Sequence, residues 1–235
     1  GLFKVHFLED KYFLEIGDTL LGRDLLIVNR ISKAAAGVRS GFAGFAGDII
    51  NESVIRFEKG PEDRIFLNKI SFRERASDSS GGMYKSLMNS SIHPILYSFD
   101  IKAFSKDSTG SVIEITSLLN SDNDLLFDAG DKRTFGLGGV QPDKSYVVSV
   151  NTYPNNLNIK TVKTYSKTPA PAPQGLGGFG GGGNTDPATF ELNSSMIVLP
   201  KTPMKSRHWD ERVGYFATGY VDFDANPQGV KNITL

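Results

Sequence analysis

The sequence predicts a mainly β protein, built as an antiparallel β-sandwich or as one large curled sheet with two or three short helices. Apolar and polar residues alternate along most of the 235-residue chain, as in strands with one buried face. Glycine, proline and asparagine separate these alternating runs. The pattern lacks the helices that join neighbouring strands of a parallel sheet. We therefore expect one domain over residues 1–235.

The N-terminal region is expected to begin with a hairpin. Residues 3–7 and 12–16 alternate apolar and polar side chains, and the short, mostly polar segment 8–11 predicts the turn between them. One turn of helix is expected at residues 17–23. The apolar run at residues 24–31 is more continuous, so it predicts a strand buried on both faces.

Two strand pairs are expected in the middle of the chain. Residues 53–72 contain two alternating runs around a Gly-Pro turn at 58–63. Residues 95–104 and 111–116 predict a second pair across the loop between them. A helical turn is expected to end before Pro94, because the residue before a proline disfavours helical backbone.

The rest of the chain predicts one more short helix and further strands. The helix is expected within residues 116–127, with Thr116 or Ser117 as its N-cap. Residues 144–166 predict the clearest hairpin, with a Pro-Asn-Asn turn at 154–156. Two late strands are expected at residues 189–200 and 212–224.

A glycine tract is the most conspicuous segment of the chain. Gly175, Gly177 and Gly180 have the G-x-G-x-x-G spacing of a dinucleotide-binding loop. That loop needs a strand before it and a helix N-terminus after it, because the helix supplies the amides that hold the pyrophosphate. The Pro-Ala residues 169–173 precede the tract and more glycines follow it. We therefore expect a flexible connecting loop at about residues 168–187 and no phosphate site.

The composition excludes several classes of function. Lysine plus arginine and aspartate plus glutamate number 26 each, so no basic surface indicates a nucleic-acid partner. The chain has no cysteine, which excludes disulfides, thiolate catalysis and cysteine-bound zinc. No apolar run reaches the ~20 residues of a membrane-spanning helix. We expect no nucleic-acid partner and no membrane span.

Catalytic motifs are also missing from the sequence. The chain has three histidines, His6, His93 and His208, and none has a second histidine four residues away. There is no His-Glu-x-x-His motif for zinc and no Gly-x-Ser-x-Gly motif for a nucleophilic serine. We therefore predict no catalytic residue and no cofactor in this chain.

One acidic turn partly fits a calcium site. Asp222, Asp224 and Asn226 have the 1, 3, 5 spacing of oxygen ligands in a calcium loop. Pro227 stands where such a loop has glycine, and Ile233 stands where it has a bidentate glutamate. The alternative interpretation is a solvated turn.

A charged and aromatic segment near the C-terminus is the candidate contact surface. Arginine and tryptophan are favoured anchors at protein interfaces. The alternative is a structured corner between strands, in which the arginines pair with nearby acidic residues. The predicted interface residues are Arg207, His208, Trp209, Asp210, Arg212, Tyr215 and Phe216.

Several segments together resemble a known family. They are GLFKVHFLEDKYFLEIGDTLLGRDLLIVNRISK, SFDIKAFSKDS, SSMIVLPKTPM and DERVGYFATGYVDF, and the resemblance covers nearly the whole chain. It is to a bacterial domain of unknown function that lies immediately N-terminal to the catalytic domain of large zinc-dependent metalloproteases of the metzincin type.

The resemblance implies a non-catalytic accessory domain of a secreted, periplasmic or surface-attached protein of a Gram-negative bacterium. It implies that the zinc-binding histidines and the catalytic glutamate belong to a catalytic domain downstream, so no zinc ligand is assigned to this chain. That catalytic domain is the expected partner. The accessory domain would act as a scaffold, a substrate-presenting surface or a brake, and a brake would reach the metal through His208 or Asp210.

Two other functions are alternatives to an accessory domain. A free-standing β-sandwich module for glycans or peptides would use exposed aromatic residues such as Trp209, Tyr215 and Tyr220. An independent hydrolase would need a site assembled from distant residues, and no motif supports it.

Overall fold

The structure is a computed structural model, and it describes most of the chain. The described residues are 1–39, 43–76, 78–167, 186–202, 204–205, 207–208, 210, 212, 217–224 and 229–234. Eleven strands of the described part form one sheet, and four form a second, smaller sheet. The mainly β prediction is therefore confirmed.

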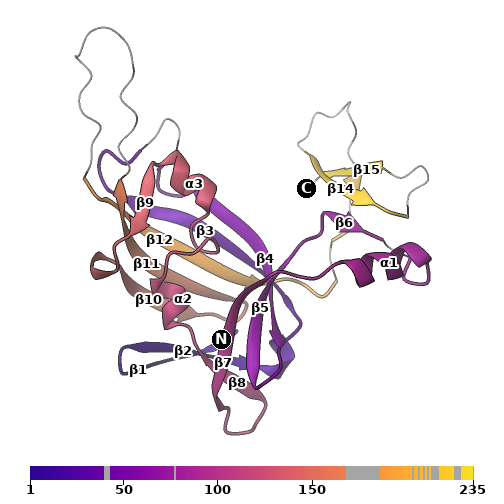
Figure 1. The fold of residues 1–235 in the computed structure, drawn as a ribbon, viewed down its shortest axis with the longest axis horizontal. Coiled ribbons are helices and arrows are strands. Elements are labelled where there is room, and N and C mark those ends of the chain that lie inside the picture. Colours follow the sequence, from indigo (N-terminus) through magenta and orange to yellow (C-terminus); the bar gives the residue numbers. More distant parts are fainter. Residues whose placement is uncertain are drawn as a thin grey trace.

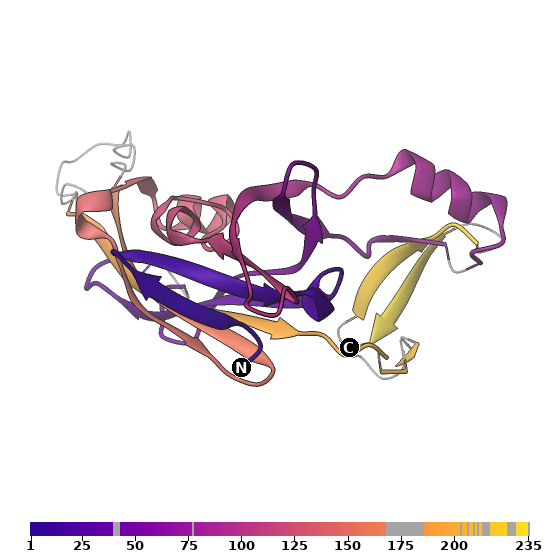
Figure 2. The same cartoon turned by 90° about the horizontal axis from the view of Figure 1, so that it is seen from below.

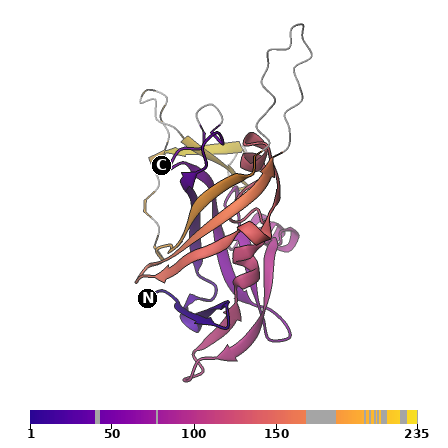
Figure 3. The same cartoon turned by 90° about the vertical axis from the view of Figure 1, so that its left-hand side faces the viewer.

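The large sheet is antiparallel and strongly curved (Figures 1 and 3). Its order is β1-β2-β8-β7-β5-β4-β3-β12-β11-β10, and β9 also pairs with β11. A single curled sheet is thus present, and not the two stacked layers of a sandwich. The strands are β1 (Lys4–Leu8), β2 (Lys11–Gly17), β3 (Asp24–Ala34), β4 (Ile49–Lys59), β5 (Arg64–Ile70), β7 (Ile95–Phe104), β8 (Gly110–Glu114), β9 (Leu137–Val140), β10 (Tyr146–Thr152), β11 (Asn156–Lys167) and β12 (Ala188–Val198).

The curvature brings the two ends of this order together. The backbone N–H of Leu2, just before β1, donates to the carbonyl of Tyr153 after β10 at 2.6 Å. The hydroxyl of Thr152 donates to the carbonyl of Phe3 at 2.9 Å. The inner face of the sheet is therefore enclosed, and side chains on that face form the core.

The interior of the curled sheet is filled by one helix and the loop after it. Figures 1 and 2 show α2 (Thr116–Asn120) and α3 (Ala129–Thr134) on the same side of the sheet. Leu118, Leu119, Leu125 and Leu126 pack with the buried side chains of the strands. Beneath α3, the Phe127 ring lies edge-on to the rings of Tyr165 and Phe190, each with a centroid distance of 5.4 Å.

Two local predictions are wrong. Strand β3 buries Leu25, Ile27 and Ile31 on one face only, because the sheet is a single layer whose outer face is not covered. Thr116 does not cap α2, because its hydroxyl accepts a hydrogen bond from the Tyr12 N–H at 2.9 Å instead. The other short helices are α1 (Gly82–Ser90) and the 3-10 turns η1 (Asp18–Leu20) and η2 (Pro142–Lys144).

A second, smaller sheet lies beside the large one together with α1 (Figures 1 and 2). Its strands, in spatial order, are β13 (Arg207–His208), β15 (Gly229–Thr234), β14 (Ala217–Asp222) and β6 (Glu74–Arg75). Among the described residues of 71–94 and 199–224, no hydrophobic side chain is buried. Within the described part of the chain, no helix is both long and apolar enough to cross a membrane.

Candidate functional site

The predicted interface segment begins in β13 of the small sheet and continues in the chain that follows β13. Arg207 and His208 form β13, which pairs with the end of β15. Asp210 and Arg212 form a two-point ion pair, with Nε to Oδ1 at 2.9 Å and a second guanidinium nitrogen to Oδ2 at 2.6 Å. These bonds hold the pKa of Asp210 below its usual value. The expected local pairing is therefore present at this point of the segment.

The other interface residues are not tested. Trp209, Tyr215 and Phe216 lie outside the described residues, so the interface as a whole stays a prediction.

The calcium candidates lie at the end of β14. An Asp222 carboxylate oxygen accepts a hydrogen bond from the Asp224 N–H at 3.0 Å, and Asp224 accepts one from the Asp78 N–H at 2.8 Å. Both carboxylates thus bind backbone groups of turns. Asn226 lies outside the described residues, so the calcium site stays a prediction. Within the described residues, no group of three His, Cys, Asp or Glu side chains is placed to hold a metal ion.

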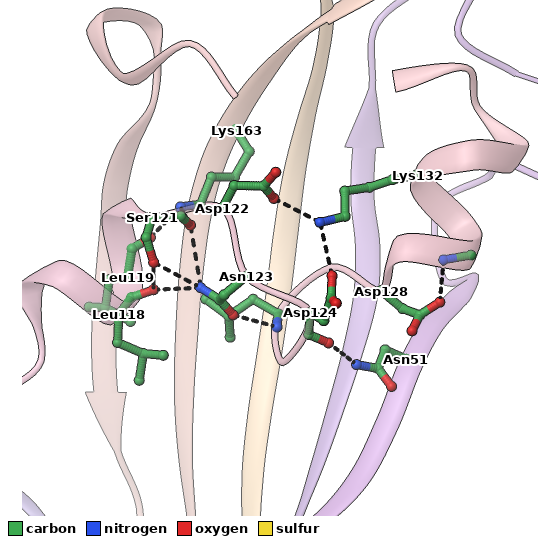
Figure 4. A network of polar contacts seen from close by, with 12 residues as sticks. Asn51, Leu118, Leu119, Ser121, Asp122, Asn123, Asp124, Asp128, Lys132 and Lys163 are labelled. Carbon is green, nitrogen blue, oxygen red and sulfur yellow. Dashed lines mark hydrogen bonds and ion pairs between the residues drawn. The ribbon is translucent and has the colours of Figure 1, made fainter. Parts of the chain in front are cut away.

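The most developed polar cluster of the described structure was not predicted. It is the loop of residues 121–128 after α2, together with Lys163 of β11 and Lys132 of α3 (Figure 4). Only 2% of Lys163 is exposed, and its ammonium donates to the backbone carbonyls of Leu119 and Ser121. Burial lowers the pKa of Lys163 to about 8, against the opposing effect of the Asp122 carboxylate. The lysine therefore satisfies the carbonyls at the end of α2, where a helix leaves acceptors unpaired.

Asn123 holds the loop in its conformation. Its amide nitrogen donates to the carbonyl of Leu118 at 2.9 Å, and its amide oxygen accepts from the N–H of Leu126 at 3.0 Å. One side chain thereby connects α2 to the residues that enter the core.

Lys132 of α3 connects the same loop to the neighbouring helix. Its ammonium lies 3.0 Å from an Asp122 oxygen and 3.1 Å from an Asp124 oxygen. Partial burial acts against the charged form of Lys132, but the two carboxylates outweigh it and raise its pKa.

The strands of the sheet bind the loop from below. The Asn29 amide donates to the carbonyl of Leu125 at 2.7 Å. The Asn51 amide donates to the carbonyl of Asp124, also at 2.7 Å (Figure 4). Asn29 is fully buried, and its amide oxygen has no hydrogen-bond partner among the described residues. The loop is therefore attached to the strands by its backbone.

A cavity of about 180 Å³ lies beside this loop. It opens between β4, β5 and β7 on one side and the loop on the other. Its lining residues are Ser53, Lys69, Leu96, Tyr97, Asn123, Asp124 and Leu125.

Comparison with protein-family models matches residues 47–235 to a domain of unknown function, DUF5117. The chain belongs to the DUF5117 family. Residues 1–34 match a second domain of unknown function, DUF5118. No curated protein and no solved structure matches the chain.

The two matched segments share one sheet in this DUF5117 protein. Strand β2, from the DUF5118 segment, pairs with β8 of the DUF5117 segment. Strand β3, also from the DUF5118 segment, lies between β4 and β12. The DUF5118 segment therefore supplies strands inside the sheet that carries the loop.

The chemistry of the loop in this DUF5117 protein is that of a structural network. Lys163 of β11 binds backbone carbonyls, Lys132 of α3 binds carboxylates of the loop, and Asn123 binds backbone groups. One sequence signal pointed to it: Lys163 shares the period-two face of Leu157, Ile159 and Tyr165, which is the buried face of β11. A charged residue on the otherwise apolar face of a strand indicates a buried polar contact.

Proposed function

We propose that this DUF5117 domain is a non-catalytic accessory domain of a secreted bacterial zinc metallopeptidase, and that it packs on the catalytic domain or regulates it. The sequence resemblance described above supports this proposal, since it covers nearly the whole chain. Zinc and its ligands belong to the catalytic domain, so this chain supplies a contact surface and no reacting group.

The observation that carries the proposal is a set of exposed apolar side chains near the small sheet. They lie on α1, in the segments on either side of it as far as the first residue of β7, and before β13. Large apolar side chains in such number on one part of a protein mark a contact surface. The residues are Phe72 (45% exposed), Met83 (40%), Met88 (52%), Ile92 (88%), Ile95 (52%) and Met204 (83%).

An exposed arginine follows β13 of the small sheet. The side chain of Arg212 is 84% exposed although it is ion-paired with Asp210. Arginines of this kind are frequent at the edges and anchors of interfaces. A mixed apolar and arginine-bearing surface suits a neighbouring domain of the same polypeptide.

The first test is to read the coding sequence beyond Leu235. We expect a His-Glu-x-x-His motif in the following domain, with a third histidine downstream. A stop codon directly after Leu235 would contradict the proposal.

The second test places the contact in the full-length protein. Met88→Asp together with Ile92→Asp should make the junction of the two domains more sensitive to limited proteolysis, because both changes put charge on the proposed contact. Phe104→Asp is the matched control, since Phe104 is 59% exposed but lies on β7 of the large sheet. Equal cleavage of all three proteins would argue against contact at α1.

The brake version has its own test. Alanine at both His208 and Asp210 in the full-length protein should raise basal proteolysis if either side chain reaches the zinc. Unchanged proteolysis would leave a scaffold or substrate-presenting role.

The alternative, a glycan- or peptide-binding module, gains no support from Tyr220. The Arg75 guanidinium lies 4.3 Å from the centre of the Tyr220 ring and covers one of its faces. A glycan array with the isolated chain would test this alternative directly.

A further inference from the structure

The cavity beside the 121–128 loop has polar groups without partners, although it lies against the core. Ser53 of β4 lines it and is only 8% exposed. Its hydroxyl makes no hydrogen bond with any residue that the structure describes. The Ser53 hydroxyl is not one of the fully buried atoms that lack a partner, so it is open to the cavity and available to a ligand.

Only one of the two charged side chains of the cavity lining has an ion-pair partner among the described residues. Asp124 and Lys69 are its two ionised side chains, and Asp124 already pairs with Lys132. Lys69, an exposed residue of β5, forms no ion pair with a described residue. The Lys69 ammonium is therefore available to an anionic ligand, and the nearby Asp124 disfavours a ligand with two negative charges.

Apart from Asn123, whose amide is hydrogen-bonded to Leu118 and Leu126, the rest of the lining is apolar. Leu96, Leu125 and the ring of Tyr97 form the walls. The volume equals that of about six water molecules at ~30 Å³ each, so only a small group fits. A strongly hydrated phosphate would leave its oxygens unpaired against these walls.

We propose that this cavity is a binding site for a small apolar carboxylate. The Lys69 ammonium and the Ser53 hydroxyl bind the carboxylate, and the aliphatic part packs on Leu96, Tyr97 and Leu125. Such a group occurs as a free short-chain acid and as the C-terminal residue of a peptide. The site uses residues of the described sheet and loop only, so it does not depend on the proposed parent enzyme.

The experiment is an NMR titration of the isotope-labelled 235-residue chain with isovalerate and, separately, with N-acetyl-leucine. Isovaleramide, which has the same shape without the charge, is the ligand control. We expect saturable shifts at Ser53, Lys69 and Tyr97 with isovalerate, and binding at least about tenfold weaker for the amide, because hydrogen bonds to a charged group are the stronger ones. N-acetyl-leucine binding as well would identify a peptide C-terminus as a source.

Variants of the chain complete the test. Lys69→Met should raise the Kd for isovalerate about tenfold, and Ser53→Ala should raise it several-fold. Lys102→Met is the matched control, because Lys102 is an exposed lysine that pairs with Asp100 on β7, outside the cavity. Absence of saturable shifts, equal binding of the amide, or unchanged binding by Lys69→Met would each overturn the proposal.

Discussion

Lys163 shows how one side chain combines a cost with a structural role. Its ammonium is buried, which is unfavourable, but it satisfies the carbonyls of Leu119 and Ser121 at the end of α2. Removing the charge would therefore remove the desolvation cost and weaken the hydrogen bonds, because a neutral amine still has N–H donors. The net contribution of Lys163 to stability depends on pH, because its pKa falls from 10.5 to about 8 on folding.

We expect Lys163 to make the stability of the protein rise between pH 8 and pH 10. In this range the folded protein has released the proton, whereas the unfolded chain still binds it, so the unfolded state binds more protons. The gain is at most about 3 kcal/mol. Urea denaturation at several pH values gives the free energies of unfolding of the wild type and of Lys163→Met. The difference between them should increase from pH 8 to pH 10.

Tyr165 requires a control in the same experiment. Burial raises the pKa of its hydroxyl, so its contribution to stability is lost as pH rises above about 10, where tyrosine of the unfolded chain ionises. Both proteins contain Tyr165, so this effect cancels in the comparison. A difference that does not change with pH would show that Lys163 keeps an ordinary pKa in the folded protein.

The loop after α2 is the element that closes the curled sheet from inside. Its polar side chains bind α2 and α3, its backbone carbonyls accept hydrogen bonds from the strands, and its two leucines enter the core. The sequence indicated only a short helix in this region. It did not indicate that Asn123 directs the loop, because the partners Leu118 and Leu126 are backbone groups whose positions depend on the fold.

We expect Asn123→Ala to destabilise the protein by about 1–3 kcal/mol, because it leaves a carbonyl and an N–H without partners in a largely buried region. Asp124→Ala is the matched control in the same loop. It removes only an ion pair whose aspartate is 68% exposed, so its effect should stay below about 1 kcal/mol. Thermal unfolding and amide exchange at residues 119–127 measure both. Equal effects of the two changes would argue against the role assigned to Asn123.

The large sheet joins segments that are far apart in the chain. Strand β3 lies between β4 and β12, and β2 pairs with β8. The DUF5118 segment therefore holds the two parts of the DUF5117 segment together. The small sheet differs, because no hydrophobic side chain is buried among the residues of 197–224 whose burial the structure describes.

We expect the chain of residues 35–235 to lose cooperative unfolding, because it lacks β1 to β3 and the sheet is divided at β3. The chain of residues 1–202 is the matched control. It keeps all eleven strands of the large sheet and should unfold cooperatively. Circular dichroism during thermal unfolding measures both. A cooperative transition for residues 35–235 would mean that the DUF5117 segment closes its sheet alone.

The sequence determined most strands, their turns and the mainly β class. These features are local: side chains alternate with a period of two, and turn residues follow one another directly. The turn at Glu9 and Asp10 is an example, because both residues adopt the positive φ angles of 49° and 59° that a tight hairpin turn uses.

Only the tertiary structure decided between a sandwich and a curled sheet, and it alone revealed the cavity and the partners of Lys163. Each of these depends on which strands become neighbours, as when Tyr153 meets Leu2 or when Leu119 meets Lys163. Such pairs are distant in sequence, and alternation shows that a strand has a buried face without showing what covers that face. The pairing of strands supplied that information, because hydrogen bonding between strands brings distant side chains onto a common face.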